Sequence, residues 1–330
     1  MPEGIFVTAA VDKWEKVYYN NGDFTKKMLA EGYFTPVKQS TLKRKTMKPN
    51  KLLPLLLPAL LLVVVLSALY AASPGFAGGR FEDEAAGHVG VFLEKNQILV
   101  SDPEAVQVEG TTATIVKGGE YKLSGSLYDG QIVVDAPEEE QVVLKLDNVD
   151  IHCEHSAPLW AKSADRVKLS LPEDSINRFS DGVMYNDPDP EVKSPSACIY
   201  AQCDLTVKGK GQLTVEANFQ DGIQSTDSLY LKNGVVMVTA PHYALRGKDD
   251  VTMVGGIWQL KSDDTAVSSA GFVDIQGGEM EIDTNGSAFH AVTAVTVGEN
   301  SRVRARCGLM SVQCGGRIEL AYPITEGEGE

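Results

Sequence analysis

Apolar and polar residues alternate in short segments from about residue 105 onward, and the pattern returns at a fixed interval. Between residues 221 and 289, a small residue followed by an apolar one recurs every 22 residues. Period-2 alternation predicts β-strands, and one repeat length predicts coils that stack their apolar residues on the coil below. The repeated triplets are Asp221-Gly222-Ile223, Tyr243-Ala244-Leu245, Thr265-Ala266-Val267 and Ser287-Ala288-Phe289.

Two strands separated by a Gly or Asn turn are expected after each triplet. Earlier coils are less regular, and helical periodicity is absent after residue 78. An antiparallel sandwich also has many short strands, but a fixed register over four coils argues against it. We therefore predict an all-β fold, a parallel β-helix over residues 105–322 with about 22 residues per coil. The expected inward residues are Leu229/Leu231, Val251/Met253, Val273/Ile275 and Val295/Val297, then Val236/Val238, Ile257/Leu260, Met280/Ile282 and Val303.

An uncharged apolar run from Leu52 to Ala72 precedes this domain and is long enough to span a membrane as a helix. Basic residues before it and acidic residues after it place the body outside the cytoplasm. Residues 47–77 are either a cleaved signal peptide or a membrane anchor, and both alternatives stay open. Residues 1–46 form an extension of uncertain origin, residues 78–104 are expected to be a linker, and residues 323–330 an acidic tail. An extracellular or cell-surface location follows from either alternative.

Charge is distributed unevenly along the chain. Of its 30 Lys+Arg and 45 Asp+Glu, residues 1–77 hold 10 and 5, which leaves 20 and 40 and a net charge of −20 for residues 78–330. Such a body repels nucleic acid, and it suits divalent cations or neutral polymers. The five cysteines show no zinc-ligand spacing and are expected to act mainly as small apolar residues.

Several segments resemble the bacterial carbohydrate-binding domain-containing β-helix family, typified by a clostridial cell-surface protein that binds cellulose and polygalacturonic acid. The resemblance implies a right-handed parallel β-helix, bound calcium, and polysaccharide binding without known cleavage. The family tends to repeat Asp-Gly-Ile at coil corners, whereas here only the corner at Asp221 among the four regular coils keeps it. The segments that carry the resemblance are residues 118–151, 163–182, 211–234 and 244–256.

Three groups of acidic residues are candidate calcium ligands, because calcium takes six to eight oxygens. The first shares a register just before a strand, the second lies at a coil corner, and the third lies in a loop of residues 180–191 that interrupts the coil rhythm. The alternative is that these residues only form turns and solvated loops. The groups are Asp165, Asp227 and Asp249 with Asp204 nearby; Asp221, about 10 Å from Asp263 and Asp264; and Asp181, Asp187 and Asp189.

Sugar binding favours exposed aromatic rings, and core or edge packing is the alternative for each of them. The predicted ligand-binding residues are Tyr200, Tyr230, Tyr243 and Trp258, with Tyr230 and Trp258 expected to point outward. No catalytic residue is predicted. Arg246 and Lys248 beside Asp249 are the basic residues that a pectate-lyase-like elimination would need.

The sequence therefore predicts a non-catalytic, exported protein that binds a pectic or cellulosic polysaccharide, possibly with calcium. One alternative is a structural β-helix that docks on another protein of the cell envelope. A polysaccharide lyase is the third hypothesis.

Overall fold

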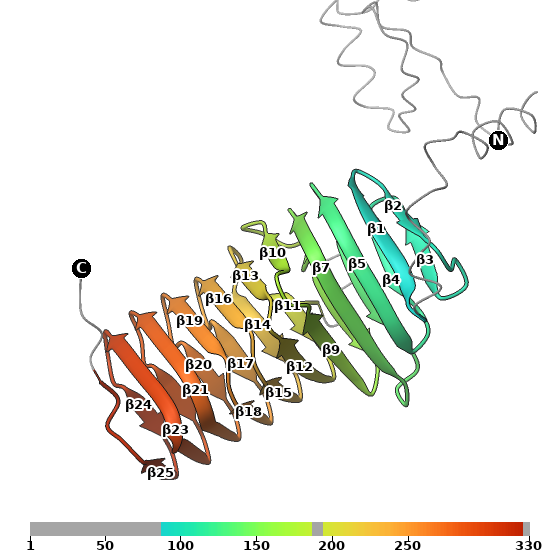
Figure 1. The fold of residues 1–330 in the computed structure, drawn as a ribbon. Helices are drawn as coiled ribbons and strands as arrows, with labels where there is room; N and C mark the ends of the chain where they lie inside the picture. Colours follow the sequence, from blue (N-terminus) through green and yellow to red (C-terminus); the bar gives the residue numbers. More distant parts are fainter. Residues whose placement is uncertain (1–86, 187–193, 326–330) are drawn as a thin grey trace, which may run out of the picture. The chain divides into compact units, whose positions relative to one another are not determined.

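A computed structural model describes residues 87–186 and 194–325. These residues form strands and turns without a helix, in two sheets of 15 and 10 strands that wind into a solenoid (Figure 1). The predictions for residues 1–46, the apolar segment 47–77 and most of the acidic tail lie outside the described residues. Within them, no helix has the length and apolar character needed to cross a membrane.

Each coil contributes one strand to each of three faces. Faces 1 and 2 belong to the larger sheet and face 3 is the smaller sheet. Face 1 contains β9 (Arg166–Leu171), β12 (Asp204–Gly209), β15 (Ser228–Leu231), β18 (Asp250–Met253) and β25 (Arg317–Leu320). Face 2 contains β10 (Ile176–Asp181), β13 (Gln212–Glu216), β16 (Val235–Ala240) and β19 (Ile257–Ser262). Four long strands cross both faces: β5 (Gly119–Leu127), β7 (Gln141–Cys153), β21 (Phe272–Thr284) and β23 (Ala294–Cys307).

Face 3 is a ladder of short strands. Its order is β24-β22-β20-β17-β14-β11-β8-β6-β4-β3, and every pair is parallel except β3 with β4. The strands are β3 (Val106–Glu109), β4 (Thr112–Ile115), β6 (Gln131–Asp135), β8 (Leu159–Ser163), β11 (Ala197–Ala201), β14 (Asp221–Ser225), β17 (Leu245–Gly247), β20 (Val267–Ser269), β22 (Phe289–Ala291) and β24 (Val312–Cys314).

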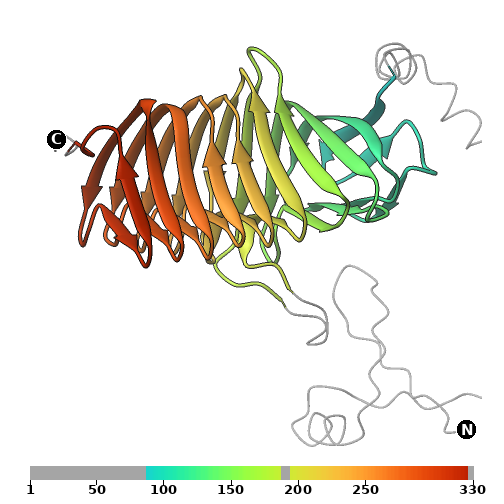
Figure 2. The same cartoon turned by 90° about the horizontal axis from the view of Figure 1, so that it is seen from below.

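The pairing between strands confirms the predicted repeat. Ile223 pairs with Leu245, Leu245 with Val267, and Val267 with Phe289, so the apolar residues of four coils lie in one row. These four side chains are completely buried. The all-β parallel solenoid is therefore confirmed, whereas its right-handed winding stays a prediction. The chain leaves the stack between β10 and β11, where the yellow-green segments descend from the coils (Figure 2).

The linker predicted for residues 78–104 is wrong over part of its length. Strand β1 (Val89–Lys95) pairs in parallel with β5, and β2 (Ile98–Val100) returns antiparallel to β1. Val91 and Leu93 are buried, which makes β1 part of the solenoid core. The coil interval did not reveal this region, because an antiparallel return does not repeat the spacing of the coils.

The prediction that Trp258 points outward and Ile257 inward is also wrong. Trp258 is 0 % exposed, whereas Ile257 is 45 % exposed. Val236 pairs with Trp258, and Trp258 pairs with Met280, so the indole continues a core row. Its Nε1 donates a hydrogen bond to the carbonyl oxygen of Gly255 at 3.0 Å, which satisfies the buried polar atom. Counting 22 residues from Val236 gives this position correctly.

The cysteines behave as the sequence predicts. All five are free thiols, and Cys153, Cys198 and Cys203 are buried. Burial raises the pKa of Cys153 to about 11 and that of Cys203 to about 12, because the thiolate is poorly solvated there. These side chains therefore serve as packing residues.

We expect Leu245→Ala to lower the free energy of unfolding by about 3 kcal/mol, because it opens a cavity in the central core row. Met237→Ala, on the outer side of face 2, should change it by less than about 1 kcal/mol, since Met237 is 36 % exposed. Urea unfolding of both variants tests this, and equal effects would contradict the assigned core row.

Candidate functional site

A row of outward side chains follows face 3 along the solenoid. Adjacent residues on a strand point to opposite sides, so the neighbours of the buried row face away from the core. The strand pairing aligns one such residue per coil, with about 4.8 Å between coils. We call this set the face 3 row, and it consists of Trp160, Tyr200, Gln224, Arg246, Ser268 and His290.

A cluster of charged and aromatic side chains lies beside this row, where successive coils turn into face 3. His242 Nδ1 is 2.7 Å from Asp221 Oδ1, and His242 Nε2 is 3.5 Å from Asp264 Oδ2. Arg246 Nη1 lies 3.5 Å from Asp221 Oδ2, and its guanidinium carbon is 5.4 Å from the centre of the Tyr243 ring. We call these five residues the corner cluster.

Burial sets the electrostatics of the corner cluster. Asp221 is 1 % exposed, and desolvation raises the pKa of its carboxyl group. Hydrogen bonds from His242 and from the backbone N–H of Tyr243 oppose that shift. The side chains of His242 and Arg246 are 39 % and 43 % exposed. Asp221 therefore holds these two side chains from below, and they present hydrogen-bond donors to solvent.

Tyr200, one of the predicted ligand residues, is buried instead. It is 2 % exposed and packs with Ala157 and Ala197 in a second apolar cluster outside the solenoid core. Trp160 and Tyr185 cover this cluster from the side. Sequence alone could not show this, because the covering residues belong to other coils and to the segment after β10.

That segment is fastened by Asp181. Its carboxylate accepts hydrogen bonds from the hydroxyl of Tyr185 and from the backbone N–H of Asn218, both at 2.5 Å. Tyr185 also stacks on Phe219, with 4.3 Å between ring centroids. Asp181 is buried, with a raised pKa caused mainly by desolvation. Its visible role is thus to anchor a turn, while Asp187 and Asp189 lie outside the described residues.

Tyr230 and Tyr243, the other two predicted aromatic residues, are half-buried and lie on different faces. Tyr230 is on face 1, where the guanidinium carbon of Arg166 is 5.8 Å from its ring centre. Arg166 also pairs with Asp204 at 2.5 Å. Tyr243 belongs to the corner cluster. The structure therefore does not bring the four predicted aromatic residues into one site.

The acidic ladder on face 1 does not supply a calcium cage. Asp227 and Asp249 lie on adjacent coils, but Cys203 lies between Asp165 and Asp227 in the stack. Asp204 aligns with Ser228 and Asp250 instead. Among residues 87–186 and 194–325, no three His, Cys, Asp or Glu side chains cluster in a way that could hold a metal ion. The described residues alone therefore do not fit calcium, which needs six to eight oxygens.

Sequence reasoning missed His242, Gln224, Ser268 and His290. Three of them follow from Arg246 by counting 22 or 44 residues along the chain, so the repeat carried the signal. His242 was considered only as a partner of a Ser or Cys nucleophile. Its carboxylate contacts come from the coil before and the coil after it, and no local motif records them.

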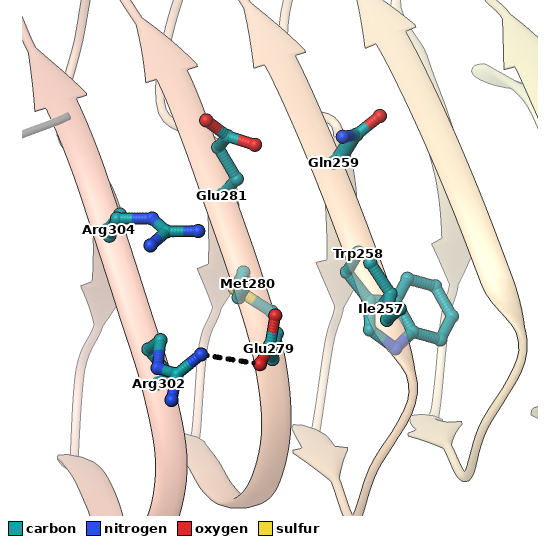
Figure 3. Close-up of a pocket in the computed structure, with 8 residues that line it drawn as sticks. All are labelled: Ile257, Trp258, Gln259, Glu279, Met280, Glu281, Arg302 and Arg304. Carbon is teal, nitrogen blue, oxygen red and sulfur yellow. Dashed lines mark hydrogen bonds and ion pairs between the residues drawn. The ribbon is translucent and has the colours of Figure 1, made fainter. Parts of the chain in front are cut away.

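Face 2 contributes only a shallow depression near its C-terminal end (Figure 3). Arg302 pairs with Glu279 across neighbouring strands at 2.7 Å, beside Ile257 and Gln259. Its volume of about 30 Å³ is far below the 300–1,000 Å³ of typical ligand pockets. A polymer that lies on the surface is a better match to this solenoid than a small molecule in a cavity.

Comparison with known proteins agrees with this picture. Residues 109–313 match the family described as "Carbohydrate-binding domain-containing protein". A protein of that description from Acetivibrio thermocellus is 32 % identical over 238 residues, which cover 70 % of this chain and 83 % of the relative. A solved structure, the gadolinium derivative of a polysaccharide lyase-like protein from C. thermocellum, superposes with a TM-score of 0.71. It is 31 % identical and covers 73 % of this chain and all of the solved chain.

We expect His242→Ala to lower the free energy of unfolding by about 2 kcal/mol at pH 7, because buried Asp221 loses a hydrogen-bond donor. Burial holds the pKa of Asp221 above that of the unfolded chain, so its charge costs stability above that pKa. The loss should therefore shrink as the pH falls through this raised pKa and Asp221 becomes protonated. Urea unfolding at pH 7 and pH 4.5 tests this, with exposed His155→Ala as the control. A loss independent of pH would contradict the assignment.

Proposed function

Because this chain belongs to the carbohydrate-binding domain-containing family, we propose that the face 3 row and the corner cluster bind a polysaccharide chain. The observation that carries the proposal is the alignment of polar side chains, one per coil, beside an accessible tyrosine. A polymer with a regular repeat is recognised well by a surface with a regular repeat. The chain of the polysaccharide would run parallel to the solenoid axis, across successive coils.

The side chains in this region suit a sugar polymer. Tyr243 offers an aromatic ring to the apolar side of a pyranose, and Gln224, Ser268 and His290 offer hydrogen-bonding groups along the row. Arg246 has a planar, charged group with several donors, which suits hydroxyl or carboxylate oxygens. A pectic polysaccharide would use Arg246 more strongly than a cellulosic one, since its uronate groups are charged.

We propose binding without cleavage. His242 has a carboxylate near each ring nitrogen, and Arg246 pairs with Asp221, so both groups are held by neighbours. Lys248 and Asp249 are exposed beyond the corner cluster. A lyase would release an unsaturated sugar, and the ultraviolet absorbance of that product provides the direct assay.

Export and calcium are further parts of the proposal. The apolar run 52–72 and the charges that flank it support a place outside the cytoplasm. The described residues cannot enclose calcium, but Asp227 and Asp249 on adjacent coils could share an ion with carboxylates of a bound uronate polymer. Such bridging would use the excess of acidic residues, which otherwise repels an acidic glycan.

Affinity electrophoresis in gels that contain polygalacturonate or a soluble cellulose derivative tests the binding surface. We expect Tyr243→Ala and Arg246→Ala each to weaken binding by about fivefold or more, because each removes a contact worth about 1 kcal/mol or more. Tyr128→Ala is the control, since Tyr128 is 59 % exposed and distant in the stack. Lack of retardation of the wild-type protein in either gel would refute the proposal.

Calcium dependence has its own prediction. Retardation by polygalacturonate should fall when EDTA is added and return with excess calcium, whereas retardation by the cellulose derivative should not change. The double variant Asp227→Asn/Asp249→Asn should bind polygalacturonate equally well with and without EDTA. A wild-type protein that is insensitive to EDTA would remove calcium from the proposal and leave the glycan surface intact.

A further inference from the structure

The apolar core rows are uncovered at the C-terminal end of the solenoid. Val251, Val273 and Val295 are completely buried, whereas Ile318, which continues their row on β25, is 48 % exposed. Leu320 continues a second core row and is 38 % exposed. Figure 1 shows β24 and β25 as the last strands of the stack. Apolar side chains that lie in the interior of every preceding coil therefore reach solvent here.

The two ends of the solenoid differ. At the N-terminal end, antiparallel pairs β1–β2 and β3–β4 close the stack, and Ile98 and Val106 are buried there. At the other end, β25 pairs with β23, and no strand among residues 87–186 and 194–325 covers its outer edge. Residues 326–330, EGEGE, add no apolar side chain. Leu309, Met310 and Tyr322 enlarge the apolar surface, with exposed fractions of 72 %, 54 % and 59 %.

An open edge of this kind favours association, because unpaired backbone groups and apolar side chains occur together. We propose that the C-terminal coil docks on the same coil of a second copy of this chain, and that a two-fold axis passes through β25 at Ile318. The two β25 strands then pair antiparallel and continue the core from one copy into the other.

Charge complementarity supports a second copy as the occupant. Arg317 and Glu319 point to the same side of β25 and pair within one chain at 3.2 Å. Antiparallel pairing about Ile318 places Arg317 of each copy opposite Glu319 of the other, so two identical ion pairs form. A two-fold interface requires such a self-complementary surface. The N-terminal end of another copy offers no equivalent edge, because its hairpins already close it.

Such a dimer would join two solenoids end to end. If face 3 binds polysaccharide as proposed, one dimer would carry two binding rows and gain avidity for a long polymer. The dimer itself does not depend on that function.

Sedimentation equilibrium of the full chain in density-matched detergent, over a range of protein concentrations, tests the proposal. We expect a concentration-dependent dimer for the wild type. Ile318→Asp should raise the dimer dissociation constant at least about a hundredfold, because two carboxylates would meet at the axis. The matched control is Ile176→Asp, which changes a 64 % exposed isoleucine on β10. A wild type that is monomeric at all concentrations would overturn the proposal.

Exchange of the paired charges tests the register. Arg317→Glu and Glu319→Arg should each weaken the dimer about tenfold, and the double exchange should restore it, since like charges across strands are unfavourable. Exchange of the exposed pair Lys210 and Glu173, 3.2 Å apart, is the control. These variants decide the matter if Ile318→Asp fails to fold. Dimers that survive both single exchanges and Ile318→Asp would place the contact elsewhere and overturn the proposal.

Discussion

The parallel hydrogen-bonded contact between one coil and the next is the interaction on which this structure depends. A single coil of about 22 residues cannot enclose a core, because its three short strands leave their apolar side chains open above and below. Stacking solves this by placing Ile223 under Leu245 and Leu245 under Val267. The same contact aligns the outward side chains, so the core rows and the surface rows have one geometric origin.

Much of the fold could be predicted because this contact leaves a trace in the sequence. The interval of 22 residues identified the regular coils, and period-2 alternation identified their strands. Trp258 was placed on the wrong side because alternation was followed from Ile257, whereas the repeat from Val236 leads to the indole. Strands β1 and β2 were missed because the end of a solenoid must be closed by chain that does not repeat.

The candidate site was less predictable, and the reason is physical. Its contacts join residues from different coils at turns, where the spacing of side chains is irregular. Asp221 illustrates this. The Asp-Gly-Ile corner invited a metal-ligand role, yet the carboxylate is buried and accepts hydrogen bonds from His242 and from the backbone of Tyr243 in the next coil. An acidic residue at a corner can thus hold coils together, and the segment anchored by Asp181 works in the same way.

Uniform coils between residues 221 and 289 have a consequence for how this surface can change over generations. Each coil contacts only its neighbours, so an in-frame duplication of 22 residues would insert one complete layer and leave the other interfaces as they are. The new layer would bring one more outward residue to the face 3 row. The length of the ligand that such a protein can read is therefore adjustable by recombination in whole coils, before any point mutation refines an individual contact.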